Sequence, residues 1–127
     1  MKVALDTNRY RDFCIGLPDV ARILQEAERI YLPFPVLAEL RAGFMAGKSG
    51  RENERVLQLF LNRRRVSPLF ADEETTFHFA RLYGQLRRQG TPIPVHDLWI
   101  AALVAQHGTV LFSRDAHFDH LPQIPRV

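Results

Sequence analysis

VALDTN, residues 3–8, joins three apolar residues directly to three side chains that carry oxygen. A run such as Val3 to Leu5 is typical of a short buried strand. The polar residues that follow, beginning with Asp6, either cap a helix that starts there or present their oxygen atoms to a ligand. The rest of the chain helps to decide between a helix cap and a ligand-binding site.

Downstream, short apolar runs alternate with segments whose apolar residues recur at helical spacing. The expected strands are 2–5, 29–33, 66–69 and 109–112, with a last short strand near 124–127, and the expected helices are 18–28, 35–47, 51–62, 72–90 and 96–107. Strands that alternate with helices pair in parallel through right-handed crossovers, which gives an open sheet covered on both faces. Ligands bind such a sheet at the carboxyl ends of its strands. We therefore predict an α/β fold whose functional crevice lies at the end of the sheet where Asp6 follows the first strand.

The length of 127 residues suits a single domain, 1–127, with a core of its own. A content of 46% hydrophobic and 24% charged residues argues against a disordered chain. Cys14 is the only cysteine, so no internal disulfide can form, which suits a reducing compartment. The apolar run 98–105 is far shorter than the roughly 20 residues that cross a bilayer, and no signal peptide is visible at the N-terminus. We therefore expect a cytoplasmic protein without membrane association.

The positive charge of the chain is clustered. The net charge is +3, and Arg63, Arg64 and Arg65 form a run, with Arg87 and Arg88 adjacent later in the chain. Arginine side chains match the geometry of phosphate groups, so a polyanion such as RNA is one interpretation of these clusters. The other is that they lie at helix C-termini, where cations are favoured. Both interpretations remain open.

Four acidic residues are expected near the same end of the sheet: Asp6, Glu39, Asp97 and Asp115. Each has an ordinary explanation, such as a helix cap for Asp6 and Asp97 or an exposed helical position for Glu39. Together, however, their charges would repel one another unless a cation lay among them. Carboxylate oxygens suit Mg²⁺ or Mn²⁺, and such an ion can activate water to cut a phosphodiester bond. The acids therefore predict a metal site for phosphodiester hydrolysis.

Four sequence motifs carry a resemblance to a known family. They are DTN at 6–8, PVLAEL at 35–40, HDLWIAA at 96–102 and FSRDAHF at 112–118. In this order and spacing, and in a chain of this length, they resemble the PIN-domain family, particularly the VapC-type toxin ribonucleases of bacterial and archaeal toxin–antitoxin pairs. The resemblance covers nearly the whole chain.

The resemblance implies a three-layer α/β/α sandwich with a parallel central sheet. It also implies that Asp6, Glu39, Asp97 and Asp115 form the catalytic, metal-binding site of an endoribonuclease. Such an enzyme depends on Mg²⁺ or Mn²⁺, hydrolyses RNA with a metal-activated water and leaves a 5′-phosphate. Members of the family usually form homodimers and are inhibited by a cognate antitoxin whose C-terminal segment covers the active-site groove.

Further residues follow from the same motifs. Thr7, Asn8 and Ser113 match polar positions that help to hold a metal, a water or an acid in place. His96 is a departure, since many relatives have Asn or Asp before the third acid, and it could alter metal affinity or pH response. Asp119, close to Asp115, is expected to support the site from outside the ligand set.

Three arginines lie close in sequence to the acids: Arg9, Arg41 and Arg114. Their guanidinium groups are candidates for binding RNA phosphates or carboxylates. The alternative for each of them is a surface salt bridge, which would contribute little to stability.

Other functions fit parts of the sequence. A phosphotransfer domain could use Asp6 as a covalent nucleophile, but Asn8 stands where a phosphatase of that type has a second acid. A zinc or iron site could use His117 and His120 with His96 and the acids. A non-catalytic nucleic-acid or protein-binding module with the same fold is the main alternative, and metal-dependent cleavage distinguishes it from the enzyme.

Overall fold

Four parallel strands form the central sheet of the computed structural model, which describes residues 1–127. The strands are β1 (Lys2–Leu5), β2 (Arg29–Pro33), β3 (Val66–Leu69) and β4 (Val110–Phe112), in the order β3-β2-β1-β4. All three neighbouring pairs are parallel, as the alternation of strands and helices predicts. The chain thus moves to one side of β1 first and ends on its other side.

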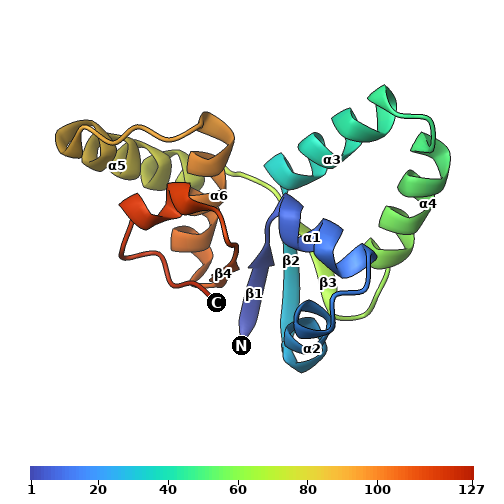
Figure 1. Ribbon diagram of the computed structural model, residues 1–127. Coiled ribbons are helices and arrows are strands. Elements are labelled where there is room, and N and C mark those ends of the chain that lie inside the picture. The colour runs from blue at the N-terminus through green and yellow to red at the C-terminus, as the bar shows by residue number, and fades with distance from the viewer.

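Helices cover both faces of this sheet (Figure 1). A right-handed crossover puts its helices on a face that depends on the direction in which the chain moves along the sheet. The steps from β1 to β3 run one way, and the step from β3 to β4 runs back. The first group of helices is α1 (Thr7–Cys14), α2 (Pro18–Glu26), α3 (Phe34–Ala46) and α4 (Gly50–Leu61), and the second is α5 (Glu73–Gln89) and α6 (Val95–His107). The expected three-layer α/β/α sandwich is confirmed.

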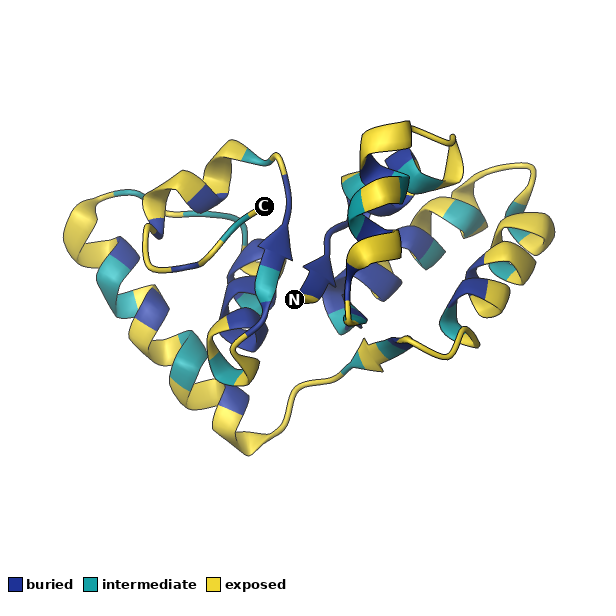
Figure 2. Ribbon diagram, turned by 90° about the horizontal axis from the view of Figure 1, so that it is seen from below, coloured by how far each residue is buried: buried dark blue, intermediate teal, exposed yellow.

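The core lies on both faces of the inner strands (Figure 2). Val3, Ala4 and Leu5 of β1 are completely buried, as is Leu32 of β2. Helix α6 is buried along most of its length, from Asp97 to Val104, because it has almost no polar face. None of the helices combines the length and the apolar character that a membrane span requires.

Several helix ends follow the local signals in the sequence. Asp72 caps α5, since its side chain accepts a hydrogen bond from the backbone of Thr75 while the Thr75 hydroxyl accepts one from the backbone of Asp72. Gly90 and Gly108 end α5 and α6 with φ of 71° and 63°. Glycine adopts this left-handed conformation without steric cost, so both helices stop where the sequence predicts.

Two segments differ from the sequence expectations. Helix α1 begins directly after Asp6 and was not expected, because its buried residues, Thr7, Tyr10 and Asp12, include two polar ones and give no apolar stripe. The expected strand near 124–127 is reduced to one parallel bridge between Leu111 and Arg126.

The inner strands should be the most sensitive part of the fold. We expect Leu32→Ala to lower the free energy of unfolding by about 2–5 kcal/mol, because it removes a completely buried side chain and leaves a cavity. Leu59→Ala on α4 is the matched control, since Leu59 is 56% exposed and its loss should change stability by no more than about 0.5 kcal/mol. Urea denaturation of both variants measures the difference. Equal losses in the two variants would contradict this assignment of the core.

Candidate metal centre

The carboxyl ends of β1 and β4 deliver two acids to the same edge of the sheet. Asp6 follows β1 directly, and its backbone N–H donates to the carbonyl of Phe112, the last residue of β4, over 3.3 Å. Asp115 lies three residues beyond Phe112. The connections on the two sides of the β1–β4 pair lie on opposite faces of the sheet, so the switch point of the sheet is between β1 and β4, and ligands of doubly wound folds bind at such a point.

Asp97 reaches this edge from the first turn of α6. The residue that caps α6 is Pro94, so Asp97 is inside the helix, and the capping role considered for it is wrong. Its carboxylate is nearly buried, with 8% of the side chain exposed. The Asp97 carboxylate therefore does not cap the helix and remains available to a ligand in the first turn of α6.

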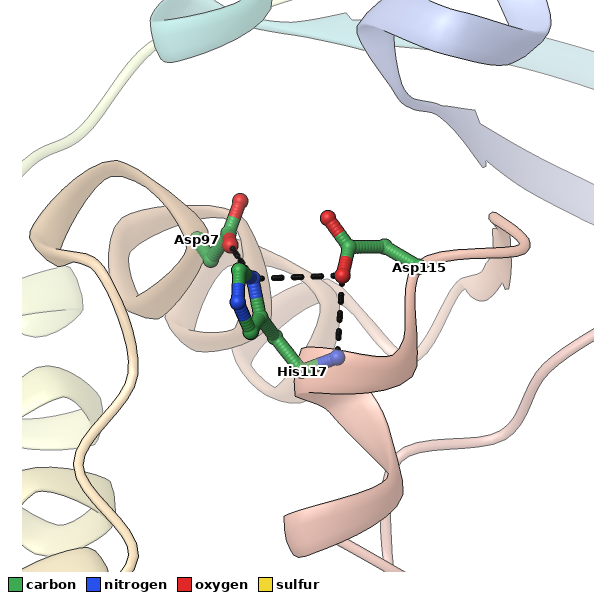
Figure 3. Close-up of side chains that lie close together, drawn as sticks. All are labelled: Asp97, Asp115 and His117. Carbon is green, nitrogen blue, oxygen red and sulfur yellow. Dashed lines mark hydrogen bonds and ion pairs between the residues drawn. The ribbon is translucent and has the colours of Figure 1, made fainter.

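His117 connects Asp97 to Asp115 (Figure 3). Its Nδ1 lies 2.7 Å from Asp97 Oδ2 and 3.1 Å from Asp115 Oδ1. One ligand atom from each of the three residues lies within 4.8 Å of the others. Figure 3 shows the second carboxylate oxygen of each aspartate on the side away from the imidazole. His120 lies in the same 3₁₀ helix as His117, Ala116–His120, but its side chain is not part of the cluster. Its backbone carbonyl accepts a hydrogen bond from Gln89.

Glu39 joins the site from α3 through His96. The Nε2 atom of His96 lies 3.9 Å from Glu39 Oε2 and 3.5 Å from Asp97 Oδ1. Both Glu39 and His96 have about half of their side chains exposed, at 45% and 54%. Glu39 is thus the outermost of the four predicted acids, on the rim formed by α3 and α6.

Asp6 both caps helix α1 and contributes a buried carboxylate to the acidic site. Its Oδ1 caps α1 by accepting from the backbone N–H of Arg9 over 2.8 Å, so the cap considered for it in the sequence is confirmed. Ser113 also hydrogen-bonds the Asp6 carboxylate, and its hydroxyl accepts from the backbone N–H of Asp115. Of the other polar residues in the motif, Thr7 is buried with no hydrogen-bond partner for its hydroxyl, whereas Asn8 is exposed.

Burial makes the charges of two acids costly. Desolvation raises the pKa of Asp6 above its ordinary value, and the nearby charge of Asp115 raises it further, against hydrogen bonds from Ser113 and Arg9. Desolvation also raises the pKa of Asp97, although the hydrogen bond to His117 opposes the shift. Buried carboxylates of this kind favour the binding of a cation that neutralises their negative charge. The donor set of carboxylate oxygens and one imidazole nitrogen fits a divalent metal ion.

A buried acid that the sequence reading did not single out, Asp12, holds two of the candidate arginines. Asp12 is 5% exposed, and its two oxygens lie 3.2 Å from Arg9 Nη1 and 3.2 Å from Arg114 Nη2. The spacing of Arg9 and Asp12 on one helix was a signal for the first pair, but the second pair joins residues 102 apart. Arg41 forms a bidentate salt bridge with Glu54 of α4.

Asp119 lies outside the cluster and pairs with Arg126. The same guanidinium donates through Nη2 to the backbone carbonyls of Ser113 and Asp115, over 3.2 and 2.9 Å. Asp119 therefore contacts the site only through Arg126, which braces the loop that carries Asp115.

The fold of this chain has counterparts among known proteins. Residues 15–124 match the family model of the PIN domain. Ribonuclease VapC4 of Mycobacterium tuberculosis is 30% identical over 88 residues, which are 69% of this chain and 68% of the relative. Among solved structures, a chain of VapBC2 from Rickettsia felis bound to a promoter DNA fragment superposes with a TM-score of 0.87 at 25% identity, covering 100% of this chain and 98% of that chain. VapBC-1 from nontypeable Haemophilus influenzae gives a TM-score of 0.88 at 25% identity, covering 100% and 97%.

The raised pKa of Asp6 predicts how stability depends on pH when chelator is present. The folded protein holds this proton more tightly than the unfolded chain, so stability falls as pH rises from about 3.8 through the raised pKa. In EDTA at pH 7, Asp6→Asn should therefore be more stable than the wild type, because the amide oxygen can still cap α1 and carries no charge. The advantage should disappear below pH 3.8, where both forms are neutral.

Urea denaturation across this pH range measures the effect. Asp19→Asn, at an acid whose side chain is 87% exposed on α2, is the control and should show no such advantage. A variant at Asp6 that is less stable than the wild type at pH 7 in EDTA would show that the buried charge carries no net cost.

Proposed function

Because the chain belongs to the PIN-domain family, we propose that it is a metal-dependent endoribonuclease and the toxin of a toxin–antitoxin pair. The observation that carries this function is the convergence of Asp6, Asp97 and Asp115 at the switch point of the sheet, two of them with raised pKa. The names of the relatives, VapC ribonucleases, and of the superposing VapBC complexes support the same activity and biological setting.

We assign the metal to the four acids predicted from the sequence. Asp97 and Asp115 would hold it directly, with Asp6 beside them and Glu39 on the rim. When bound, a divalent ion such as Mg²⁺ or Mn²⁺ lowers the pKa of a water and stabilises charge on a phosphodiester. Ser113 orients Asp6 and the backbone of Asp115 through its hydroxyl, and we assign Thr7 and Asn8 to the same supporting role.

Arg9 and Arg114 are suited to position the RNA backbone. Both converge on Asp12 beside the acidic edge, and Arg114 keeps 55% of its side chain exposed. An arginine oriented by a buried carboxylate loses less conformational freedom when it binds a phosphate. Arg41 is already engaged with Glu54, so its binding to RNA would have to compete with that pair.

The reaction is hydrolysis of an RNA phosphodiester bond. Water adds to phosphorus, the bond to the 3′ oxygen breaks, and the products are a 5′-phosphate and a 3′-hydroxyl. The residues of the chain would bind and orient the phosphate, and the half-exposed side chains of Glu39 on α3 and His96 on α6 leave that side of the site accessible to a polymer. An RNA substrate places the proposed activity in the cytoplasm.

Two partners besides RNA belong to the proposal. The first is a cognate antitoxin, whose apolar side chains would fit a hollow of about 460 Å³ between α1, α3 and α4 that is lined by Ile15, Phe44 and Val56 among others. The second is another copy of this chain, for which Phe70 and Phe77, each 63% exposed, offer apolar surface.

RNA cleavage by the purified protein tests the function. A structured RNA incubated with Mg²⁺ or Mn²⁺ should be cut into fragments with 5′-phosphates, and EDTA should stop the reaction. Asp97→Asn should lower the rate by more than about 100-fold, because even partners of metal ligands cost up to that much when lost. Asp19→Asn, at a side chain of α2 that is 87% exposed and contacts none of the acids, should cut as the wild type does.

Two outcomes would contradict the enzyme. One is a wild-type protein that binds RNA but cuts it under neither metal. The other is an Asp97→Asn variant, folded by circular dichroism, that retains full metal-dependent cleavage. Either result would favour the non-catalytic binding module that shares this fold.

A further inference from the structure

An imidazole nitrogen lies among the carboxylates of the site, and the acidic motifs alone do not account for it. We propose that His117 is a nitrogen ligand of the divalent ion and that it makes the site prefer Mn²⁺ over Mg²⁺. This inference rests on the proposed metal-dependent function and goes beyond it, since it names the ion and the residue that selects it.

The distances around His117, one of which is a hydrogen bond to Asp97, also match those between neighbouring ligands of one ion. Two ligands at right angles around an ion with bonds of about 2.1 Å are about 3 Å apart. Nδ1 of His117 lies 2.7 Å from Asp97 Oδ2 and 3.1 Å from Asp115 Oδ1. The three donor atoms therefore need only small movements to face a common centre.

The fold holds His117 in this position from two directions. Asp115 caps the short 3₁₀ helix Ala116–His120, and its Oδ1 accepts from the backbone N–H of His117 over 2.9 Å. The next residue, Phe118, is buried at 1% exposure. The guanidinium of Arg126 lies over the Phe118 ring and donates to the carbonyl of Asp115. The imidazole is thus anchored through its backbone while 47% of its side chain stays exposed to an incoming ion.

The chemistry of the donors leads to the preference. Mg²⁺ is a hard ion that binds oxygen ligands and keeps several waters. Mn²⁺ also binds oxygen ligands but, as a first-row transition ion, binds a nitrogen donor more strongly than Mg²⁺ does, although it is the weakest binder of that series. A site with two aspartates and one histidine thus favours Mn²⁺ relative to a site of carboxylates alone. His96 does not take the same part, because its Nε2 is 3.5 and 3.9 Å from the nearest acids and belongs to the exposed rim.

Pulsed electron paramagnetic resonance of bound Mn²⁺ tests the inference directly. The wild-type protein loaded with Mn²⁺ should show modulation from an imidazole ¹⁴N nucleus, and labelling the histidines with ¹⁵N should change its frequency. His117→Ala should abolish the nitrogen signal. His120→Ala, in the same 3₁₀ helix but with a side chain outside the cluster, should retain it.

Metal affinity provides the second measurement. We expect His117→Ala to weaken Mn²⁺ binding by about 10-fold or more, in the range seen when groups at metal sites are removed. Mg²⁺ affinity, measured by competition with Mn²⁺, should change by less than about 3-fold, because Mg²⁺ depends on the oxygen donors. His117→Gln keeps a polar side chain of similar length and should lose the nitrogen signal as well.

The outcomes separate this inference from the function on which it rests. If bound Mn²⁺ shows no nitrogen modulation while RNA is cut, the ribonuclease stands and the role of His117 is wrong. If the modulation is present and depends on His117 while no RNA is cut, the ligand assignment stands and the function is wrong. A nitrogen signal that survives His117→Ala and disappears in His96→Ala would also overturn the assignment.

Discussion

The carboxylates at the ends of β1 and β4 repel one another, and the other groups of the site are arranged around the need to offset this negative charge. Asp6 and Asp97 are 6% and 5% exposed, so water cannot screen them, and the charge of Asp115 acts on both. A parallel sheet brings such residues together because the carboxyl ends of its strands share one edge.

Positively charged or hydrogen-bonding groups offset the carboxylates from several directions. Ser113 and the N-terminus of α1 stabilise Asp6, and His117 does so for Asp97. Asp97 itself lies in the first turn of α6, where the helix dipole favours a negative charge. Even so, the pKa of both acids stays above its ordinary value, so these contacts do not fully replace water. The remaining imbalance is what a bound cation would relieve.

The sequence predicted the order of strands and helices well, because that order depends on local patterns of apolar residues. It did not predict α1, whose inner face contains Thr7 and Asp12 in place of apolar residues. It also could not decide whether Asp97 was a cap or a ligand, since the residue that caps α6, Pro94, has no side-chain group that would mark it as the cap. The contacts of His117 with Asp97 and of Arg114 with Asp12 join residues 20 and 102 apart, and only tertiary structure brings them together.

Asp12 and His117 illustrate two different uses of a charged partner in one site. Asp12 is buried and paired with two arginines, so it sets where they lie, and it is not among the residues whose ligand atoms cluster at the site. His117 is half exposed and contacts the acids through a nitrogen that can also bind a metal. In the metal-free site its imidazole offsets the negative charge of Asp97, and when an ion takes over that task the same nitrogen becomes available as a ligand. The His117 side chain can therefore reduce the charge repulsion of the metal-free site and also influence which metal ion the site prefers.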